Sequence, residues 1–440
     1  MNTVRDLRQY ADSQLFAGEY LRALQAYVLL VELQPGDLDA RLRIGDALLA
    51  IGEVQKAAVV YTVFARHSAH AGYPLRALVA MKILTALEPQ LAALVNGIAE
   101  LYAIESPRLG RGVRLAPGDP EQPLPPGLDP TALAAQDVVV ARAERVGADL
   151  ERIGAAYPEH LPPIPLFSEL PADAFAAVLA ALKLRRTRPG EVVIAEGEPG
   201  QSFYVIARGA VRVTKRRAQG DVITLASLHD GSIFGEMALV SASPRTATVT
   251  ADSDCDLLEF DRDALAAASR EVGTVARALD KFTRERLLNN LLATAPLFRP
   301  LDRKQRLDLV RRFTAHDVAA GTEIIHEGDQ GRGLFVLLAG EVDVSKIDGE
   351  EKVLLATLAP GEIFGEISLV QEAPTTASVT AARQSTVLFL AREYFQKLLE
   401  AVPEIRAYVE STTEERLMDT RILLDSDGTV ELADDDLVLV

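Results

Sequence analysis

Two residues of opposite charge, Glu236 and Arg245, lie nine positions apart in the stretch FGEMALVSASPRTATV. A guanidinium can grip the oxygens of a phosphate with charge-assisted hydrogen bonds. A carboxylate repels a phosphate, but it accepts hydrogen bonds from hydroxyl groups such as those of a sugar. Gly235, Ala238 and Ala247 are small enough for the backbone to approach a ligand closely. The stretch therefore predicts a site for a phosphate joined to a ribose.

An ion pair between Glu236 and Arg245 that closes an empty loop is the simpler alternative, but it would not require small residues. The stretch resembles the phosphate-binding cassette of cyclic nucleotide-binding domains, with matches at Phe234, Gly235, Glu236, Ala238, Leu239, Pro244, Arg245, Ala247 and Val249. The resemblance implies that the ligand is cAMP or cGMP, with no separate cofactor. It places Glu236 on the ribose 2′-hydroxyl, Arg245 on the cyclic phosphate and the Ala238 amide on a phosphate oxygen. The implied ligand-binding set is Phe234, Gly235, Glu236, Met237, Ala238, Pro244, Arg245, Thr246 and Ala247.

Thr246 bears on which base is bound. The cAMP sites of this family more often carry alanine after the arginine, whereas cGMP-responsive sites carry threonine or serine. The hydroxyl of Thr246 could reach the 2-amino group of guanine, which would permit cGMP binding. A β-branched residue is equally favoured by an ordinary strand, so the residue type leaves both bases open.

A second copy of the phrase, FGEISLVQEAPTTASV, begins at Phe364, 130 residues after the first. Glu366 keeps its place, but Thr375 stands where the arginine would be. Without that cation we expect a degenerate second site, formed by Gly365, Glu366, Ser368, Thr375 and Thr376. An interaction surface for proteins is the favoured role, and a weak or different ligand is the alternative. Arg332 could supply a replacement cation.

The repeat extends well beyond the two loops. PGEVVIAEGEPGQSFYVIARGAVRV, from Pro189, corresponds to AGTEIIHEGDQGRGLFVLLAGEVDV, from Ala320. Short alternating runs with glycines at the corners predict antiparallel strands that roll into a barrel. We expect two β-rolls of the jelly-roll type with flanking helices, at residues 158–290 and 291–424. The acid that often steadies the arginine is replaced in the first copy by Gln201 and Ser202, so the partner of Arg245 is open.

The N-terminal stretch has a different period, of 34 residues. Ala23 recurs as Ala57, Tyr27 recurs as Tyr61, and Gly45 lies seven residues before Gly52. Small residues where helices touch, followed by an aromatic residue, predict helical hairpins that stack on each other. These residues resemble the tetratricopeptide repeat, and a plain helical hairpin bundle is the alternative.

The fold class is therefore α+β and multidomain. Helical repeats are expected at 1–106, a proline- and glycine-rich tether at 107–130, a connecting helix at 131–157, the two rolls, and an acidic tail at 425–440. The tail could add a strand to the sheet edge of a partner. An apolar residue from the helix after the first roll would cover the base, and the candidates are Leu279, Phe282, Leu287 and Leu288. Such residues more often pack their helix on the roll.

Charge and composition exclude several partners. The chain has 46 Lys and Arg against 63 Asp and Glu, a net charge of −17, which repels nucleic acids and acidic membranes. No apolar stretch reaches the ~20 residues that cross a bilayer, so direct membrane insertion is not expected. The single Cys255 cannot form an internal disulfide and the first residues do not form an apolar leader, which favours the cytoplasm.

An enzyme is not expected, because the six histidines are scattered and no phosphate-loop or kinase motif is present. His67 and His70 share a helix face but have no clear third metal ligand. A transcription factor would need a basic helix-turn-helix after its roll. A kinase regulatory subunit also has paired rolls, but it carries an inhibitory basic segment before them. The only similar string here, LRRT at 184–187, is predicted to be part of a strand.

The sequence thus predicts a non-enzymatic, cytoplasmic and bacterial regulatory protein. The first roll would bind cAMP or cGMP, and the helical repeats would signal to a protein effector. The alternative is a scaffold in which the rolls and the repeats bind only proteins.

Overall fold

The structure is a computed structural model of the 440-residue chain. It describes residues 1–87, 92–110, 112, 114, 118–149, 157–216, 221–236, 245–271, 274, 275, 277, 278, 281, 282, 288, 295–349 and 351–425. The chain forms two compact units, Met1–Phe282 and Thr283–Val440, and each is described by itself.

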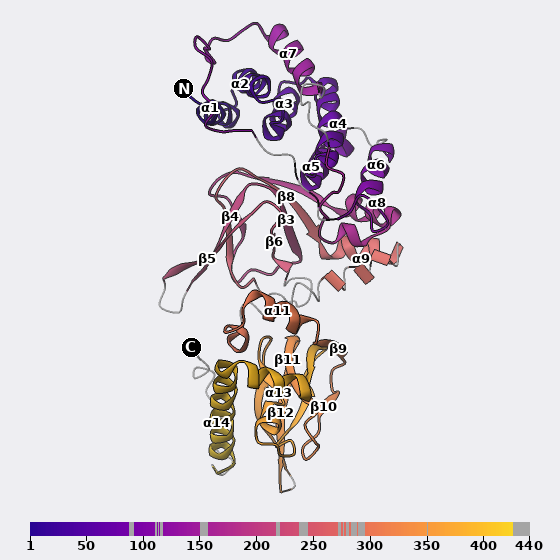
Figure 1. Cartoon of the computed structure of the whole chain (residues 1–440), viewed down its shortest axis with the longest axis vertical. Helices are drawn as coiled ribbons and strands as arrows, with labels where there is room; N and C mark the ends of the chain where they lie inside the picture. Colours follow the sequence, from indigo (N-terminus) through magenta and orange to yellow (C-terminus); the bar gives the residue numbers. More distant parts are fainter. Residues whose placement is uncertain are drawn as a thin grey trace. The chain divides into compact units, whose positions relative to one another are not determined.

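The first unit begins with a helical array. Its helices are α1 (Val4–Phe16), α2 (Tyr20–Leu33), α3 (Leu38–Ala50), α4 (Val54–His70), α5 (Pro74–Leu87), α6 (Ala92–Tyr102) and α7 (Gln136–Ala148). From α1 to α5, each helix packs on the next one along the chain, and α7 packs across α2, α3 and α4 (Figure 1). Among the helices that the structure describes, none combines the length and the apolar composition of a membrane-spanning segment.

The 34-residue period is visible in the hydrogen bonds of the array. The Tyr27 hydroxyl donates to Asp12 at 2.7 Å, and the Tyr61 hydroxyl donates to Asp46 at 2.5 Å. Both members of the second pair lie 34 positions after those of the first. Gly45 faces the Tyr61 ring so closely that a Cβ atom there would lie 2.6 Å from it. The predicted N-terminal helices are therefore present, and two corresponding hydrogen bonds of the array follow the 34-residue spacing.

The segment expected to be an extended tether lies along the array instead. The side chain of Gln34 donates to the carbonyl of Asp119 at 2.5 Å, that of Gln25 donates to Ala132 at 2.8 Å, and Thr3 forms a β-bridge with Pro123. Proline and glycine leave main-chain carbonyls without regular partners, and these polar side chains satisfy them. The helix that follows spans Gln136–Ala148 and is shorter than the expected 131–157.

The first roll consists of two antiparallel four-stranded sheets. In the order of pairing, one contains β1 (Lys183–Thr187), β8 (Cys255–Asp261), β3 (Ser202–Arg208) and β6 (Ile233–Phe234). The other contains β2 (Val192–Ile194), β7 (Thr248–Ala251), β4 (Ala210–Arg216) and β5 (Val222–His229). The flanking elements are η2 (Phe167–Glu169), α8 (Ala172–Ala181) and α9 (Arg262–Glu271).

The second unit repeats this topology strand for strand. One sheet pairs β9 (Thr314–Val318), β16 (Ser385–Ala391), β11 (Gly333–Ala339) and β14 (Ile363–Phe364). The other pairs β10 (Glu323–Ile325), β15 (Ser378–Ala381), β12 (Val342–Asp348) and β13 (Glu351–Leu358). Its helices are η4 (Pro296–Phe298), α11 (Arg303–Val310), α12 (Glu366–Val370), α13 (Arg392–Ala401) and α14 (Pro403–Asp425). The two predicted rolls are thus present with matching strand orders.

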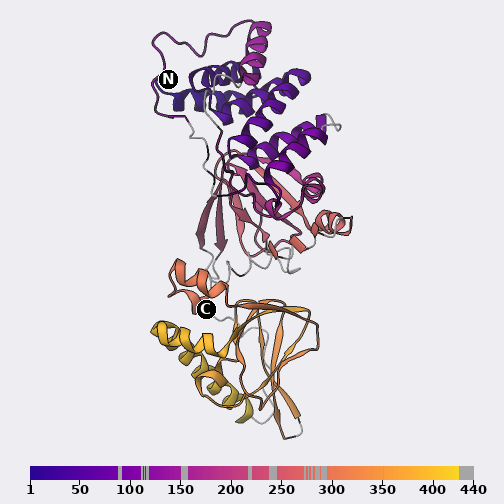
Figure 2. The same cartoon turned by 45° about the vertical axis from the view of Figure 1, so that its right-hand side comes forward.

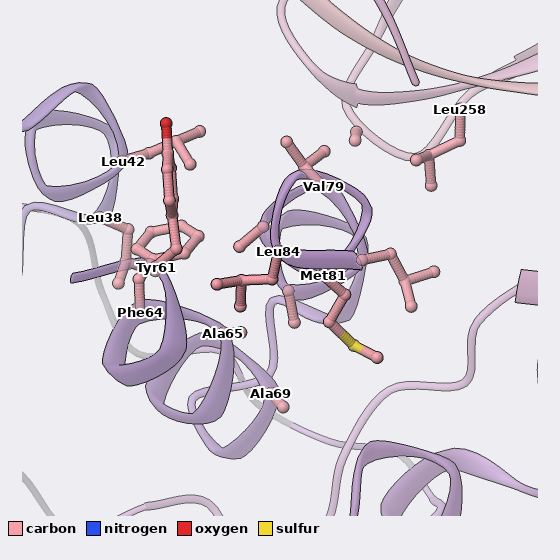
Figure 3. Close-up of a cluster of buried hydrophobic side chains, with 14 of the residues drawn as sticks. Leu38, Leu42, Tyr61, Phe64, Ala65, Ala69, Val79, Met81, Leu84 and Leu258 are labelled. Carbon is pink, nitrogen blue, oxygen red and sulfur yellow. The ribbon is translucent and has the colours of Figure 1, made fainter. Parts of the chain in front are cut away.

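The helical array and the first roll share a hydrophobic core. α5 packs on β1 and β3, and both views show the array against the strands of this roll (Figures 1 and 2). Leu38 of α3, Phe64 of α4 and Met81 of α5 lie in one cluster with Leu258 of β8 (Figure 3). All four side chains are buried. The first unit is therefore a single packed body rather than two domains on a tether.

A buried ion network crosses the same boundary. Asp46 of α3 pairs with Arg43 at 2.6 Å and with Arg186 of β1 at 2.7 Å. Asp256 of β8 pairs with Arg186 at 3.0 Å and with Arg208 of β3 at 2.8 Å. Burial alone would raise the pKa values of Asp46 and Asp256, but the arginines outweigh it and hold both below the ordinary value. Because Arg186 belongs to the LRRT string, that string has a structural role, as predicted.

Candidate functional site

The side chain of Arg245 is fixed by two main-chain carbonyls. Its Nη1 donates to the Gly235 carbonyl at 3.0 Å, and its Nη2 donates to the Ser202 carbonyl at 2.6 Å. Ser202 is the first residue of β3, and its own hydroxyl donates to Glu259 of β8 at 3.0 Å. The roll therefore holds the arginine through the first residue of a central strand. The main-chain carbonyl of Ser202 takes the place of the missing acid.

Glycines make room for the guanidinium. A Cβ atom at Gly200 would lie 1.9 Å from Nε of Arg245, and one at Gly235 would lie 3.0 Å from Nη1. Gly235 also has φ = +79°, a conformation that other residues rarely adopt. A larger residue at Gly200 would displace the arginine from its carbonyl partners.

The charge of Arg245 is only partly compensated. Burial lowers its pKa, while Tyr204 and Glu259 act in the opposite direction. Among the residues that the structure describes, no carboxylate forms an ion pair with its guanidinium. A half-buried guanidinium that donates to neutral carbonyls remains a good partner for an anion.

The other predicted residues of this cassette are placed as follows. Phe234 is buried on β6, and its ring stacks on that of Tyr204 with centroids 5.2 Å apart. Glu236 and Ala247 lie on the two sides of the undescribed residues 237–244, and both are half-buried. Thr246 is exposed. Met237, Ala238 and Pro244 lie outside the described residues. Arg245 and Gly235 are in direct contact.

Phe282, one of the expected covers for the base, has a different place. Its ring packs on Phe203, with centroids 5.8 Å apart, in the core shared with the helical array. Neighbouring strand residues point to opposite faces, and Tyr204, the next residue of β3, lies in the separate core inside the roll. Phe282 therefore packs its helix on the outer face of the roll and does not cover the pocket. Leu288 is buried, while Leu279 and Leu287 lie outside the described residues.

In the second roll, two hydroxyls of the cassette donate to main-chain carbonyls, and one of these carbonyls is the counterpart of an Arg245 acceptor. Thr375 Oγ1 donates to the His326 carbonyl at 2.6 Å. Ser368 Oγ donates to the Gly365 carbonyl at 3.1 Å, and Gly365 corresponds to the residue that accepts from Arg245 in the first roll. Both hydroxyl hydrogens are therefore turned toward the main chain and away from a ligand. The predicted loss of the phosphate cation has this structural counterpart.

The second roll nevertheless has a cavity of about 280 Å³ at its cassette. Its lining includes Gly365, Glu366, Ser368, Thr375 and Thr376, which is the whole predicted second site. Glu366 is buried, and its Oε1 accepts a hydrogen bond from Arg416 of α14 at 2.7 Å. Arg416 also donates to the carbonyl of Ile363 at 2.7 Å. α14 thus closes one side of this cavity.

A family model, the cyclic nucleotide-binding domain, matches residues 184–271 and 315–402. The two matches fall on the two rolls. The rolls are cyclic nucleotide-binding domains. Domains of this family bind cyclic nucleotides, which agrees with the predicted ligand class, and the predicted tandem arrangement of such domains after N-terminal helices is confirmed.

The chain is similar to regulatory subunits of cAMP-dependent protein kinases. It is 34% identical over 239 residues to that of Yarrowia lipolytica, covering 54% of this chain and 59% of the relative. With the type II regulatory subunit of Drosophila melanogaster it is 31% identical over 237 residues, covering 53% and 59%. The cAMP-bound regulatory domain of Toxoplasma gondii PKA matches with 25% identity, 57% and 92% coverage and a TM-score of 0.29. The chain spans less than two thirds of the length of these curated relatives.

These similarities correct two expectations. The sequence argued against the kinase regulatory-subunit type, yet the chain is similar to such subunits over 239 residues. The curated relatives are eukaryotic, so a bacterial origin has no support. The relatives are named as regulatory and not as catalytic subunits, which agrees with the prediction of a non-enzymatic protein.

Sequence reasoning missed several residues of the two sites. Gly200 could have been found from the sequence, because a glycine, Gly331, occupies the corresponding position of the second copy 131 residues later. Ser202 contributes its carbonyl, which any residue type could supply, so no side-chain pattern points to it. Arg416 lies far along the chain from Glu366, and only the packing of α14 on α12 brings them together.

Proposed function

We propose that the chain is a non-enzymatic cyclic nucleotide receptor that binds cAMP or cGMP in its first roll and regulates a protein partner. The observation that carries this proposal is the placement of Arg245, whose guanidinium donates to two neutral carbonyls and keeps a charge for an anion. Glu236, at the far end of the same loop, is the acceptor for the ribose. In this proposal Met237, Ala238 and Pro244 complete the ligand-binding set.

The partner is proposed to be a protein that docks on the tetratricopeptide-like repeats. The curated relatives are named as regulatory subunits of a protein kinase, so a kinase catalytic subunit is the first partner to test. α3 and α5 already use part of their surface to contact the first roll. The nucleotide site and the repeats therefore belong to one packed unit, and a change in the loop can act on the array without a flexible linker.

The test is to titrate the full chain with cAMP and with cGMP by calorimetry, alongside the variant Arg245→Ala. We expect the variant to lose at least about 2–5 kcal/mol of binding free energy, since a buried phosphate would be left without its charged partner. Arg212→Ala is the matched control, because Arg212 is a half-exposed arginine of β4 paired with Asp252. It should bind as the natural chain does.

A scaffold that binds only proteins is the other candidate. It predicts no heat of binding and no melting shift with either nucleotide. Equal affinities of the natural chain and a folded Arg245→Ala variant would remove the first-roll assignment as well. Circular dichroism of both arginine variants establishes that the fold is retained.

A further inference from the structure

α7 shows how the helical array holds an added helix. It packs on α2, α3 and α4. Arg142 of α7 pairs with Glu32 of α2, and its Nε donates to the carboxylate at 2.8 Å. Gly147 of α7 is so close to the array that a Cβ atom there would lie 2.8 Å from Val60 and 3.3 Å from Ile44. An ion pair and a small residue in close contact therefore fix this helix in its groove.

The next repeat presents the same face of its helix without a cover. α2 and α4 correspond at the 34-residue spacing, so Arg66 occupies the position of Glu32. Gln25, which binds the main chain of residues 132 and 134 ahead of α7, corresponds to Val59, which is exposed. A cavity of about 350 Å³ lies between α4 and α6, and Arg66 lines it. The groove between α4 and α6 therefore corresponds to the groove that α7 fills, with the charge at position 32 reversed.

This second groove combines a positive end with an apolar wall. Arg66 is exposed and, among the residues that the structure describes, has no ion-pair partner. His70 also lines the cavity; burial lowers its pKa, and the nearby Arg108 and Arg66 lower it further. Leu94 and Ile98 of α6 form the apolar side. No carboxylate is among the described lining residues, so the groove suits an acid that is flanked by apolar side chains.

Gly97 makes α6 a surface that another helix can approach closely. Glycine inside a helix is destabilising relative to alanine. A Cβ atom at Gly97 would meet no described atom within 4 Å, so packing inside the chain does not require this glycine. In the first groove the close contact depends on Gly147, which lies on the added helix. In the second groove the glycine lies on the array itself and lines the cavity.

We propose that the groove between α4 and α6 binds an amphipathic helix of a protein partner, which pairs a carboxylate with Arg66 and packs apolar side chains over Gly97 and Leu94. The arrangement repeats that of α7 with the two charges exchanged. The inference rests on the proposed role of the repeats as the docking surface for a protein effector, and it gives that effector a chemistry. It does not depend on which nucleotide the first roll binds.

The probe is a peptide with the sequence of α7, because α7 already fits the corresponding groove. Residues 136–148 are synthesised with a fluorescent label as the natural sequence and as Arg142→Glu, and both peptides carry a side-chain staple because short isolated helices are marginally stable. Anisotropy is measured against the full chain. The Arg142→Glu peptide should bind about three- to tenfold more tightly than the natural peptide, because it faces Arg66 with an opposite charge. The difference should shrink in about 0.5 M salt.

Two substitutions assign the binding to the groove. Arg66→Glu should reverse the preference in favour of the natural peptide. Gly97→Leu should weaken both peptides by at least about tenfold, because its side chain fills the space above α6, and the melting temperature should not fall because leucine is a better helix former. Arg22→Glu is the matched control, since Arg22 is a half-exposed arginine of α2 outside the cavity lining. It should leave both affinities unchanged.

Three results would overturn the proposal. They are absence of peptide binding at millimolar concentration, an unchanged preference in Arg66→Glu, and undiminished binding by a folded Gly97→Leu variant. Hydrogen exchange should show protection of α4 and α6, whereas faster exchange of residues 136–148 would mean that the peptide displaces α7 and would contradict the assignment. Nucleotide titrations of the same proteins separate the two proposals. Retained cAMP or cGMP binding without peptide binding removes the groove alone, and peptide binding without nucleotide binding removes the receptor assignment alone.

Discussion

The guanidinium of Arg245 and the main-chain carbonyl of Ser202 lie 2.6 Å apart, so the first residue of β3 holds the arginine of the loop. A carbonyl fixes the position of a guanidinium without neutralising its charge. An acid in that place would compete with a phosphate for the same donor hydrogens. The first roll therefore combines a fixed geometry with a cation that still has charge to offer.

The proposed ribose contact of Glu236 can be separated from the phosphate contact. Glu236→Gln should weaken cAMP and cGMP by on the order of 1–3 kcal/mol, because a charged acceptor is lost. The 2′-deoxy analogues should lose much less, since they lack the donating hydroxyl. Calorimetry with both ligand series gives the comparison, and Glu191→Gln, at a half-exposed glutamate of the same roll, is the control. Equal losses with ribose and deoxyribose ligands would assign Glu236 another role.

The choice of base is proposed to involve Thr246, which is exposed on the described part of the loop. Thr246→Ala should weaken cGMP by about 0.5–1.5 kcal/mol, the net value of one neutral hydrogen bond, and leave cAMP unchanged. Competition between the two nucleotides on the natural chain and on the variant measures this difference. If both nucleotides weaken together, the residue serves the phosphate or the fold.

The ion network between the array and the first roll should be sensitive to the loss of one member. Asp46→Ala removes the partner that Arg43 and Arg186 share, but Arg43 keeps Asp254 and Arg186 keeps Asp256. The cost should therefore fall below the about 3–5 kcal/mol of an isolated buried pair and above that of a surface pair. Asp252→Ala removes a partner from the half-exposed Arg212 and should cost about 0–1 kcal/mol. Urea denaturation of the full chain, followed by hydrogen exchange of peptides from α3 and β8, compares the two variants. Similar costs would show that the network contributes little.

The same network predicts how stability depends on pH. The arginines hold the folded-state pKa values of Asp46 and Asp256 below their ordinary value. The stabilisation is therefore fully present above the unfolded pKa of about 3.9 and is lost as the pH falls below it. Each such carboxylate contributes a slope of up to about 1.4 kcal/mol per pH unit in that window.

Hydrogen exchange of α3 and β8 between about pH 5 and pH 3 should accelerate beyond the intrinsic effect of pH. The slope of the opening free energy should be smaller in Asp46→Asn, which has no titrating group at that position. Asp252→Asn, on the exposed pair, should retain the natural slope. A natural chain with no extra slope in this range would contradict the assignment.

The local sequence was enough to predict the N-terminal helices and the two rolls, because their signals are short and periodic. Ala23, Tyr27, Ala57 and Tyr61 are buried in the array, and the strands of the two rolls correspond one to one. The packing of residues 118–132 along the array was not predictable, since it depends on Gln25 and Gln34 many residues earlier. Proline and glycine are equally typical of free tethers.

The contacts of single side chains could not be predicted from the sequence either. Phe282 has the residue type of a base cover, but its place in the outer core depends on the helical array that packs against Phe203 and Phe260. The cavity at the second cassette is likewise bounded by Arg416 of α14, 50 residues after Glu366. In both cases the deciding neighbours are distant in sequence, and no local pattern specifies them.

The shared core of the first unit also determines when this chain can fold during its synthesis. Leu38 and Phe64 leave the ribosome early, whereas Leu258, which packs in the same cluster, is added near the end of the roll. At about 5–20 residues per second, the ribosome needs on the order of ten to forty seconds to bridge that interval. During that time the apolar faces of the nascent helices are exposed and must not form non-native contacts. The helices synthesised first therefore bury their shared core only after the first roll has been synthesised.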